Sequence, residues 1–224
     1  MSAWHFAWRK RSQPARNYGT TYAGGTNSNG AIFSVSTNGN VFKRLYSFTA
    51  LDPDTGTNKD GANPGAGLIL SGNTLYGTTS AGGSGGYGTV FAINTNGTGF
   101  TTLHGFTATS GSLSTNSDGA NPAAGLILAG NTLYGTTSQG GTNGNGVLFS
   151  LLPPFGILSP QLSGGNFLFS FQAFAGASYT VQQNTNLAGT NWIAFTNIIG
   201  SGTVTQLTLP TTNAARLFFR VRQP

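Results

Sequence analysis

One motif occurs three times in this chain at a constant spacing, and that regularity constrains the fold more than any other feature. The copies YGTTYAGG, YGTTSAGG and YGTTSQGG begin at Tyr18, Tyr76 and Tyr134, so successive copies are 58 residues apart. A fixed period of this size is typical of tandem repeats in which each unit packs only against its neighbours. The sequence therefore predicts a repeat architecture over residues 18–152.

The complete central copy is expected to form four β-strands, at residues 67–70, 74–79, 89–93 and 100–106. Charged residues make up only 6% of the chain, and runs of Thr, Val, Phe and Tyr are broken by Gly and Asn. This composition favours strands and tight turns over helices. Asn-Gly pairs at 38–39 and 96–97 predict type I′ hairpin turns, so neighbouring strands should be antiparallel.

Segments such as GLIL and TVFAI are apolar on both faces, so each small sheet must be covered on both sides. Sheets stacked as the blades of a propeller meet this requirement. The first copy supplies its last three strands and the third copy its first three, which gives fewer blades than a closed propeller needs. Either upstream blades are missing, another chain completes the ring, or the units form an open array; we favour missing upstream sequence.

The period ends at Leu152-Pro153-Pro154, and the segments that follow alternate apolar and polar residues, as in NFLFSFQ and SYTVQQ. Such alternation predicts one buried and one solvated face, and therefore a small C-terminal β-sandwich over residues 153–224. Residues 1–17 match nothing in the repeat and are expected to be an unstructured tail with a non-native start. The predicted fold is all-β: an incomplete β-propeller-like array of four-stranded antiparallel blades followed by a small β-sandwich.

The charge and the cysteine content exclude several classes of function. The formal charge of +6 comes mainly from Lys and Arg near the two termini, while the repeats carry few cations. We therefore expect no nucleic-acid partner. The chain has no Cys, which excludes disulfides and Cys-ligated zinc. No apolar run approaches the ~20 residues of a membrane span, so none is expected.

Two of the four acidic residues recur with the repeat. Asp60 and Asp118 each begin a DGANP motif, 58 residues apart. Equivalent carboxylates could bind a cation or a sugar at the mouth of a channel, or form the carboxylate pair of a glycosidase. The interpretation that we favour is a turn in which the aspartate accepts backbone N–H bonds.

The segment from Asp52 through Asp54 to Asp60 alternates oxygen-bearing side chains, a pattern found in calcium loops. The next copy has Ser110 and Ser112 in place of the first two aspartates, which argues against a repeated calcium site. We expect no cofactor, with a single calcium site as the alternative.

Aromatic residues are the remaining candidates for binding. Tyr18, Tyr76 and Tyr134 could line a surface on which glycans stack, or they could anchor each sheet against its neighbour. His104 takes the place of Tyr46 in the preceding copy, as expected of a cross-strand surface position. No pattern of Ser, His and carboxylate residues indicates a catalytic site, so no catalytic residue is assigned.

The succession DGANP, GLIL, NTLYGTT, GG and GTVF resembles the Gloeo/Verruco (GloVer) tandem repeat of bacterial choice-of-anchor proteins, over residues 18–150. The C-terminal segment is similar to a β domain common on secreted proteins of Verrucomicrobia-like bacteria. This resemblance implies a secreted or cell-surface, propeller-like protein without assigned catalysis. Our leading hypothesis is a non-enzymatic protein that acts in adhesion, polysaccharide contact or scaffolding. The alternatives are a carbohydrate-active propeller enzyme that uses Asp60 and Asp118, and a purely structural spacer.

Overall fold

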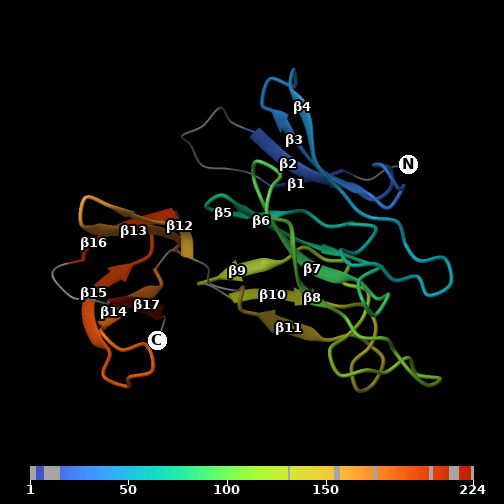
Figure 1. The fold of residues 1–224 in the computed structure, drawn as a ribbon. Coiled ribbons are helices and arrows are strands. Elements are labelled where there is room, and N and C mark those ends of the chain that lie inside the picture. The colour runs from blue at the N-terminus through green and yellow to red at the C-terminus, as the bar shows by residue number, and fades with distance from the viewer. Residues whose placement is uncertain are drawn as a thin grey trace. The chain divides into compact units, whose positions relative to one another are not determined.

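The computed structural model describes residues 4–7, 16–130, 132–153, 157–173, 176–201, 204–211 and 217–222. Every regular element in these ranges is a β-strand, which confirms the predicted all-β class. The chain divides into two compact units, residues 1–153 and 154–224 (Figure 1). The described residues include no helix long and apolar enough to cross a membrane.

The first unit consists of antiparallel sheets in which strands adjacent in sequence pair with each other, as the repeat predicts. The first sheet contains β1 (Trp4–Ala7), β2 (Arg16–Thr21), β3 (Ala31–Ser36) and β4 (Phe42–Ser47). The second contains β5 (Ile69–Ser71), β6 (Thr74–Thr79), β7 (Thr89–Asn94) and β8 (Thr101–Gly105). The third contains β9 (Ile127–Ala129), β10 (Thr132–Thr136) and β11 (Leu148–Leu151).

Two predictions about this unit are wrong. Residues 4–7 lie inside the expected unstructured tail but form β1, which pairs with β2 because the inner edge of that strand is otherwise open. The hairpin turns are also not type I′. A type I′ turn needs positive φ at both central residues, but only Gly39 and Gly97 have it, and Asn38 and Asn96 do not. The N–H groups of Gly39 and Gly97 instead donate to Ser36 O and Asn94 O, so each glycine is the last residue of its turn.

The glycine of each YGTT motif lies directly opposite a phenylalanine of the next strand. Gly77 pairs with Phe91 across β6 and β7, and Gly135 pairs with Phe149 across β10 and β11. A Cβ added to Gly77 would lie 2.6 Å from Phe91 Cζ, so the ring lies over the backbone. An aromatic ring that covers a cross-strand glycine stabilises an otherwise weak strand position.

Consecutive sheets of the first unit pack against each other through hydrophobic cores, so the second sheet is covered on both faces. Buried apolar side chains of this kind stabilise the fold by about 1.5–3 kcal/mol each. The first core comprises Tyr18, Ile32, Phe48, Leu68, Leu75, Phe91 and Ile93. The second core comprises Tyr76, Val90, Ala92, Phe106, Leu126 and Leu133.

The asparagine of each DGANP motif fastens a sheet to the one before it. The Asn63 backbone N–H donates to Asn29 O at 2.8 Å, and its Nδ2 donates to Tyr22 O at 3.1 Å, both in the loop between β2 and β3. Asn121 makes the equivalent pair of bonds to the loop between β6 and β7. Both asparagines have left-handed backbone φ, which Asn tolerates better than most residues. We call this arrangement the asparagine latch.

The second unit contains two antiparallel sheets, ordered β12-β13-β16 and β15-β14-β17. Phe167 stacks on Phe219 with ring centroids 5.6 Å apart, and Phe171 contacts Tyr179 at 5.1 Å, so aromatic rings join the two sheets. The strands are β12 (Ile157–Ser163), β13 (Asn166–Gln172), β14 (Ser178–Asn184), β15 (Ile193–Ile199), β16 (Val204–Pro210) and β17 (Phe218–Arg222).

Candidate functional site

Asp60 is a buried carboxylate that the protein itself satisfies. Its side chain is 3% exposed and accepts hydrogen bonds from the Tyr46 hydroxyl at 2.8 Å and from the Thr49 N–H at 2.9 Å. The Thr49 hydroxyl donates to the other carboxylate oxygen. A buried carboxylate needs such donors, because an unpaired charge costs several kcal/mol. Asp60 therefore ties the end of β4 to the loop that leads into the next repeat.

Tyr46 shows the effect of this environment. Burial, together with the hydrogen bond to Asp60 and the negative charge of that carboxylate, raises the pKa of Tyr46 far above its ordinary value. The hydroxyl consequently stays protonated throughout the neutral range and donates a hydrogen bond to Asp60.

Asp118 holds the same place one repeat later, with a histidine as its partner. His104 Nε2 lies 3.0 Å from Asp118 Oδ2, and the Thr107 N–H and hydroxyl complete the set of donors. His104 was expected only at a surface position, because its separation of 14 positions from Asp118 hides the pair in the sequence. In the preceding repeat a tyrosine makes the corresponding bond, so a hydrogen bond to the aspartate is what the two positions share.

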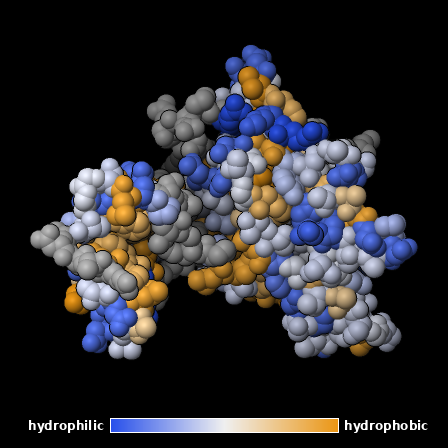
Figure 2. Space-filling model, viewed as in Figure 1, coloured by the Kyte–Doolittle hydropathy of each residue, from blue (hydrophilic) through white to orange (hydrophobic). Residues whose placement is uncertain are grey.

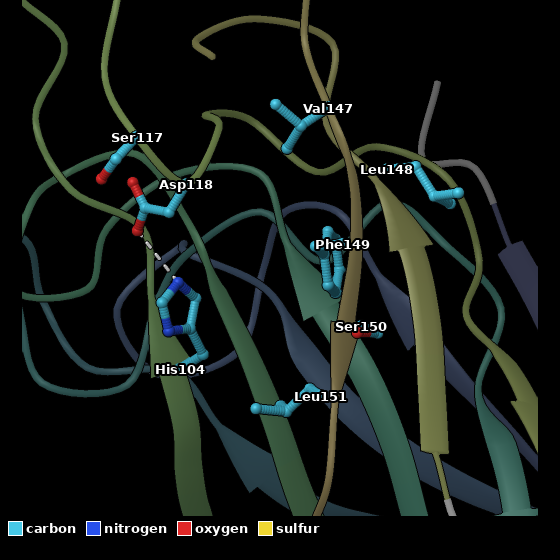
Figure 3. A pocket seen from close by; sticks show the side chains of 8 residues that line it. All are labelled: His104, Ser117, Asp118, Val147, Leu148, Phe149, Ser150 and Leu151. Atoms are coloured by element: carbon cyan, nitrogen blue, oxygen red, sulfur yellow. Dashed lines mark hydrogen bonds and ion pairs between the residues drawn. The ribbon is translucent and has the colours of Figure 1, made fainter. Parts of the chain in front are cut away.

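A cavity of about 300 Å³ opens beside this pair. In Figure 3, His104, Ser117 and Asp118 lie on one side, and the residues of β11 lie on the other. The volume is at the lower limit of ordinary ligand pockets and suits one or two side chains or a small ring. The lining residues are His104, Ser117, Asp118, Val147, Leu148, Phe149, Ser150 and Leu151.

The corresponding space between the first and second sheets is occupied by Phe100, the residue before β8. Its ring stacks on Tyr46 with centroids 4.0 Å apart and planes 6° apart, and it also stacks on Phe91 at 5.5 Å. One repeat later, His104 and Phe149 stand in the places of Tyr46 and Phe91. The cavity therefore lies where a third aromatic residue would complete the pattern.

The three tyrosines predicted to contact glycans do not share one environment. Tyr18 and Tyr76 are buried in the first and second hydrophobic cores. Tyr134 is 38% exposed, because the packing found between described residues of the first unit covers only the opposite face of the third sheet. The three side chains thus form no common surface, and Tyr134 alone among them is accessible to a ligand.

The predicted calcium ligands are engaged in separate local structures. Asp52 accepts hydrogen bonds from the Thr55 hydroxyl and the Thr55 N–H, both at 2.8 Å, and these bonds lower the pKa of Asp52. Asp54 donates its backbone N–H to the same carboxylate, and Asp60 is held by Tyr46 and Thr49. Within the described ranges, no three His, Asp or Glu side chains lie together.

Asn58 and its counterpart Asn116 have a structural role that was not predicted from the sequence. Asn58 Nδ2 donates to Thr49 O and Gly61 O, while its Oδ1 accepts from the N–H groups of Gly61 and Gly83, all within 3.1 Å. Asn116 makes the same four bonds one repeat later. One amide thus closes the long connection between β4 and β5 and joins it to the loop between β6 and β7. The recurrence of Asn at the repeat spacing was the signal for it.

The comparison with curated proteins found no match. The model of one protein family, described as the Gloeobacter/Verrucomicrobia repeat, matches residues 15–204. The match spans the glycine–phenylalanine pairs, the aspartate sites and the asparagine latches described above. It confirms the resemblance to the GloVer repeat, and the chain belongs to the Gloeobacter/Verrucomicrobia repeat family.

Proposed function

We propose that this protein is a non-enzymatic, exported or surface-displayed scaffold. In this proposal its repeats act as propeller-type blades, its second unit is a β-sandwich, and its third sheet docks against a further repeat sheet. The proposal rests on one observation: the open face of the third sheet repeats a face that is buried in the second sheet.

Equivalent residues of the second and third sheets differ in exposure. Tyr76 and Val90 of the second sheet are 4% and 0% exposed because the third sheet covers them. One repeat later, Tyr134 and Leu148 are 38% and 74% exposed, and Ile127 beside them is 67% exposed. Figure 2 shows hydrophobic surface over β9 and β10. Apolar patches of this kind mark interaction sites, and here the repeat itself indicates the shape that fits.

A non-enzymatic role agrees with the way in which the carboxylates are used. Asp60 is closed off by Tyr46 and Thr49, and Asp118 makes the same bonds through His104 and Thr107. At the first of these sites the partner is a tyrosine whose pKa lies far above neutrality, so it is unsuited to exchange protons. Both sites thus serve to hold loops together.

Oligomeric state tests the docking. Multi-angle light scattering on the purified full chain should show concentration-dependent self-association, since a second copy supplies the further repeat sheets. Ile127→Lys, which places a charge on the open face, should weaken that association by more than tenfold. Leu113→Lys changes an equally exposed apolar residue in a loop and is the matched control. A wild-type chain that stays monomeric at high micromolar concentration would contradict the proposal.

Polysaccharide contact is the competing role for the same face, because Tyr134 lies on it. A glycan array with the full chain distinguishes the two. Binding that is lost in Tyr134→Ala but kept in Ile127→Lys would favour glycan contact over docking. Turnover of any bound polysaccharide, abolished in Asp118→Asn, would instead support the enzyme alternative.

A further inference from the structure

Among the described strands, none completes the third sheet in the way that β8 completes the second. In the second sheet, β8 pairs antiparallel with β7, with Phe91 opposite Thr102 and Ala92 opposite Thr101. In the third sheet β11 is an edge strand, and no described strand pairs with its outer side. Unpaired N–H and C=O groups on such an edge form a template for another strand.

In the preceding interface, this outer strand does more than pair with its neighbour. Phe100 enters the space between the sheets and stacks on Tyr46 and Phe91. The Thr102 hydroxyl donates to Lys59 O at 2.9 Å, which ties the strand to the loop before Asp60. The strand therefore has three attachments: a ladder, an aromatic anchor and a hydrogen bond to the loop.

Each of these attachments has a vacant counterpart at β11. The edge of β11 corresponds to the edge of β7. His104 and Phe149 correspond to Tyr46 and Phe91, the two rings that hold Phe100, and Ser117 corresponds to Lys59. All of these groups line the cavity of about 300 Å³ (Figure 3). By the repeat spacing, position 158 should supply the anchor, but Leu158 lies in β12, which pairs with β13 in the second unit.

We propose that the outer edge of β11 binds an extended peptide segment as a fourth strand, with a phenylalanine of that segment inserted beside His104. Addition of a strand to an open edge obtains affinity from main-chain hydrogen bonds and specificity from side-chain pockets. Here the free edge of β11 would make the main-chain hydrogen bonds, and the cavity would hold the phenylalanine side chain.

The chain itself shows which sequence the site takes. The outer strands of the first two sheets begin and end on phenylalanine, as FKRLYSF at residues 42–48 and FTTLHGF at residues 100–106. The partner is therefore a segment of the pattern Phe-x-x-Leu-x-x-Phe from another polypeptide. Its first phenylalanine takes the place of Phe100, and its last corresponds to Phe106, which is fully buried.

This inference does not rest on the docking of a further sheet, because the edge and the open face are different surfaces of the third sheet. Ile127→Lys should weaken self-association by more than tenfold and leave peptide binding intact. A substitution beside the cavity should have the opposite effect, so the two proposals can fail separately.

The test uses the full chain and a fluorescently labelled synthetic peptide of sequence GFTTLHGFTA, which copies residues 99–108. Fluorescence anisotropy should show saturable binding, and the peptide with Phe100→Ala should bind about tenfold more weakly, because it loses a stacked ring. In the protein, His104→Ala should cause a similar loss, whereas His104→Tyr should retain binding, because Tyr46 supports Phe100 in the same way. Circular dichroism checks that both variants fold.

Hydrogen–deuterium exchange identifies the place of binding. Bound peptide should protect amides of β11, at residues 148–151, from exchange. Three results would overturn the proposal: no binding, equal binding of a scrambled peptide, or binding without protection of β11. Protection confined to residues 89–94 is a case of the third result and would mean that the peptide merely displaces β8.

Discussion

His104 Nε2 lies 3.0 Å from Asp118 Oδ2, where one repeat earlier a tyrosine hydroxyl meets its own aspartate at 2.8 Å. If the hydrogen bond is what matters, His104→Tyr should be tolerated. We expect its free energy of unfolding to change by less than about 0.5 kcal/mol, whereas His104→Phe should cost about 1–3 kcal/mol by leaving Asp118 without that donor. Urea unfolding followed by circular dichroism measures both variants. Equal losses in the two would contradict the assigned role.

Tyr46→Phe should be at least as costly, because Asp60 is more deeply buried than Asp118. We expect a loss of about 1–3 kcal/mol at neutral pH. The raised pKa of Tyr46 adds a pH dependence, since the unfolded chain releases this proton at lower pH than the folded chain does. The stability from Tyr46 is fully present below its unfolded pKa of about 10 and is lost as the pH rises further. Unfolding curves from pH 7 to 11 should therefore show the gap between wild type and Tyr46→Phe narrowing above about pH 10.

Asn116→Ala should be among the most damaging polar substitutions in the chain. It removes four hydrogen bonds and leaves the Gly119 and Gly141 N–H groups without their acceptor. We expect a loss of about 2–4 kcal/mol, measured by calorimetry as a lower midpoint of unfolding. Asn40→Ala, in an exposed hairpin turn, is the control and should change stability by less than about 0.5 kcal/mol. A similar small effect at Asn116 would show that water replaces the amide.

Gly77→Ala should destabilise the second sheet through steric overlap. The new methyl group would lie 2.6 Å from Phe91 Cζ and 2.7 Å from Leu68 Cδ2, so the core must shift. Overpacking of this kind costs about 1–3 kcal/mol. Gly39→Ala is the contrasting variant, because its Cβ meets open space and only its positive φ is unfavourable. Urea unfolding should give Gly77→Ala a lower free energy of unfolding than Gly39→Ala. The reverse order would mean that the Phe91 ring moves aside without cost.

The strands of the repeat were predictable because local signals agree with one another. The second strand was expected at residues 74–79 and β6 spans Thr74–Thr79, bounded by a glycine turn before it and the glycine loop after it. β1 was missed because its place depends on the open edge of β2, and residues 4–7 carry no repeat motif to indicate it. Pairing with an available edge is a tertiary property that a short, unpatterned segment does not reveal.

The candidate site was only partly predictable. Asp60 and Asp118 were identified by their spacing, and their acceptance of backbone N–H bonds was expected, but the side chains of Tyr46 and His104 were not assigned to them. Those partners depend on how the last residues of β4 and β8 face the following loop. The repeat spacing predicts an outer strand around position 158 that would fill the cavity. Leu158 instead lies in β12, which pairs with β13 in the second unit.

The asparagine latch has a consequence for how such a chain can lengthen. The N–H and Nδ2 groups of Asn63 and Asn121 each donate to the repeat immediately before, while their backbone oxygens accept from Ser80 and Ser138 of their own repeat. In a duplicated 58-residue segment inserted between two repeats, the asparagine would find the same carbonyl acceptors in the repeat before it. The loop of the inserted segment would offer the same acceptors to the asparagine of the repeat after it. Recombination between repeats can therefore add or remove whole segments without creating a mismatched junction, and chains of different repeat number remain foldable by the same local rules.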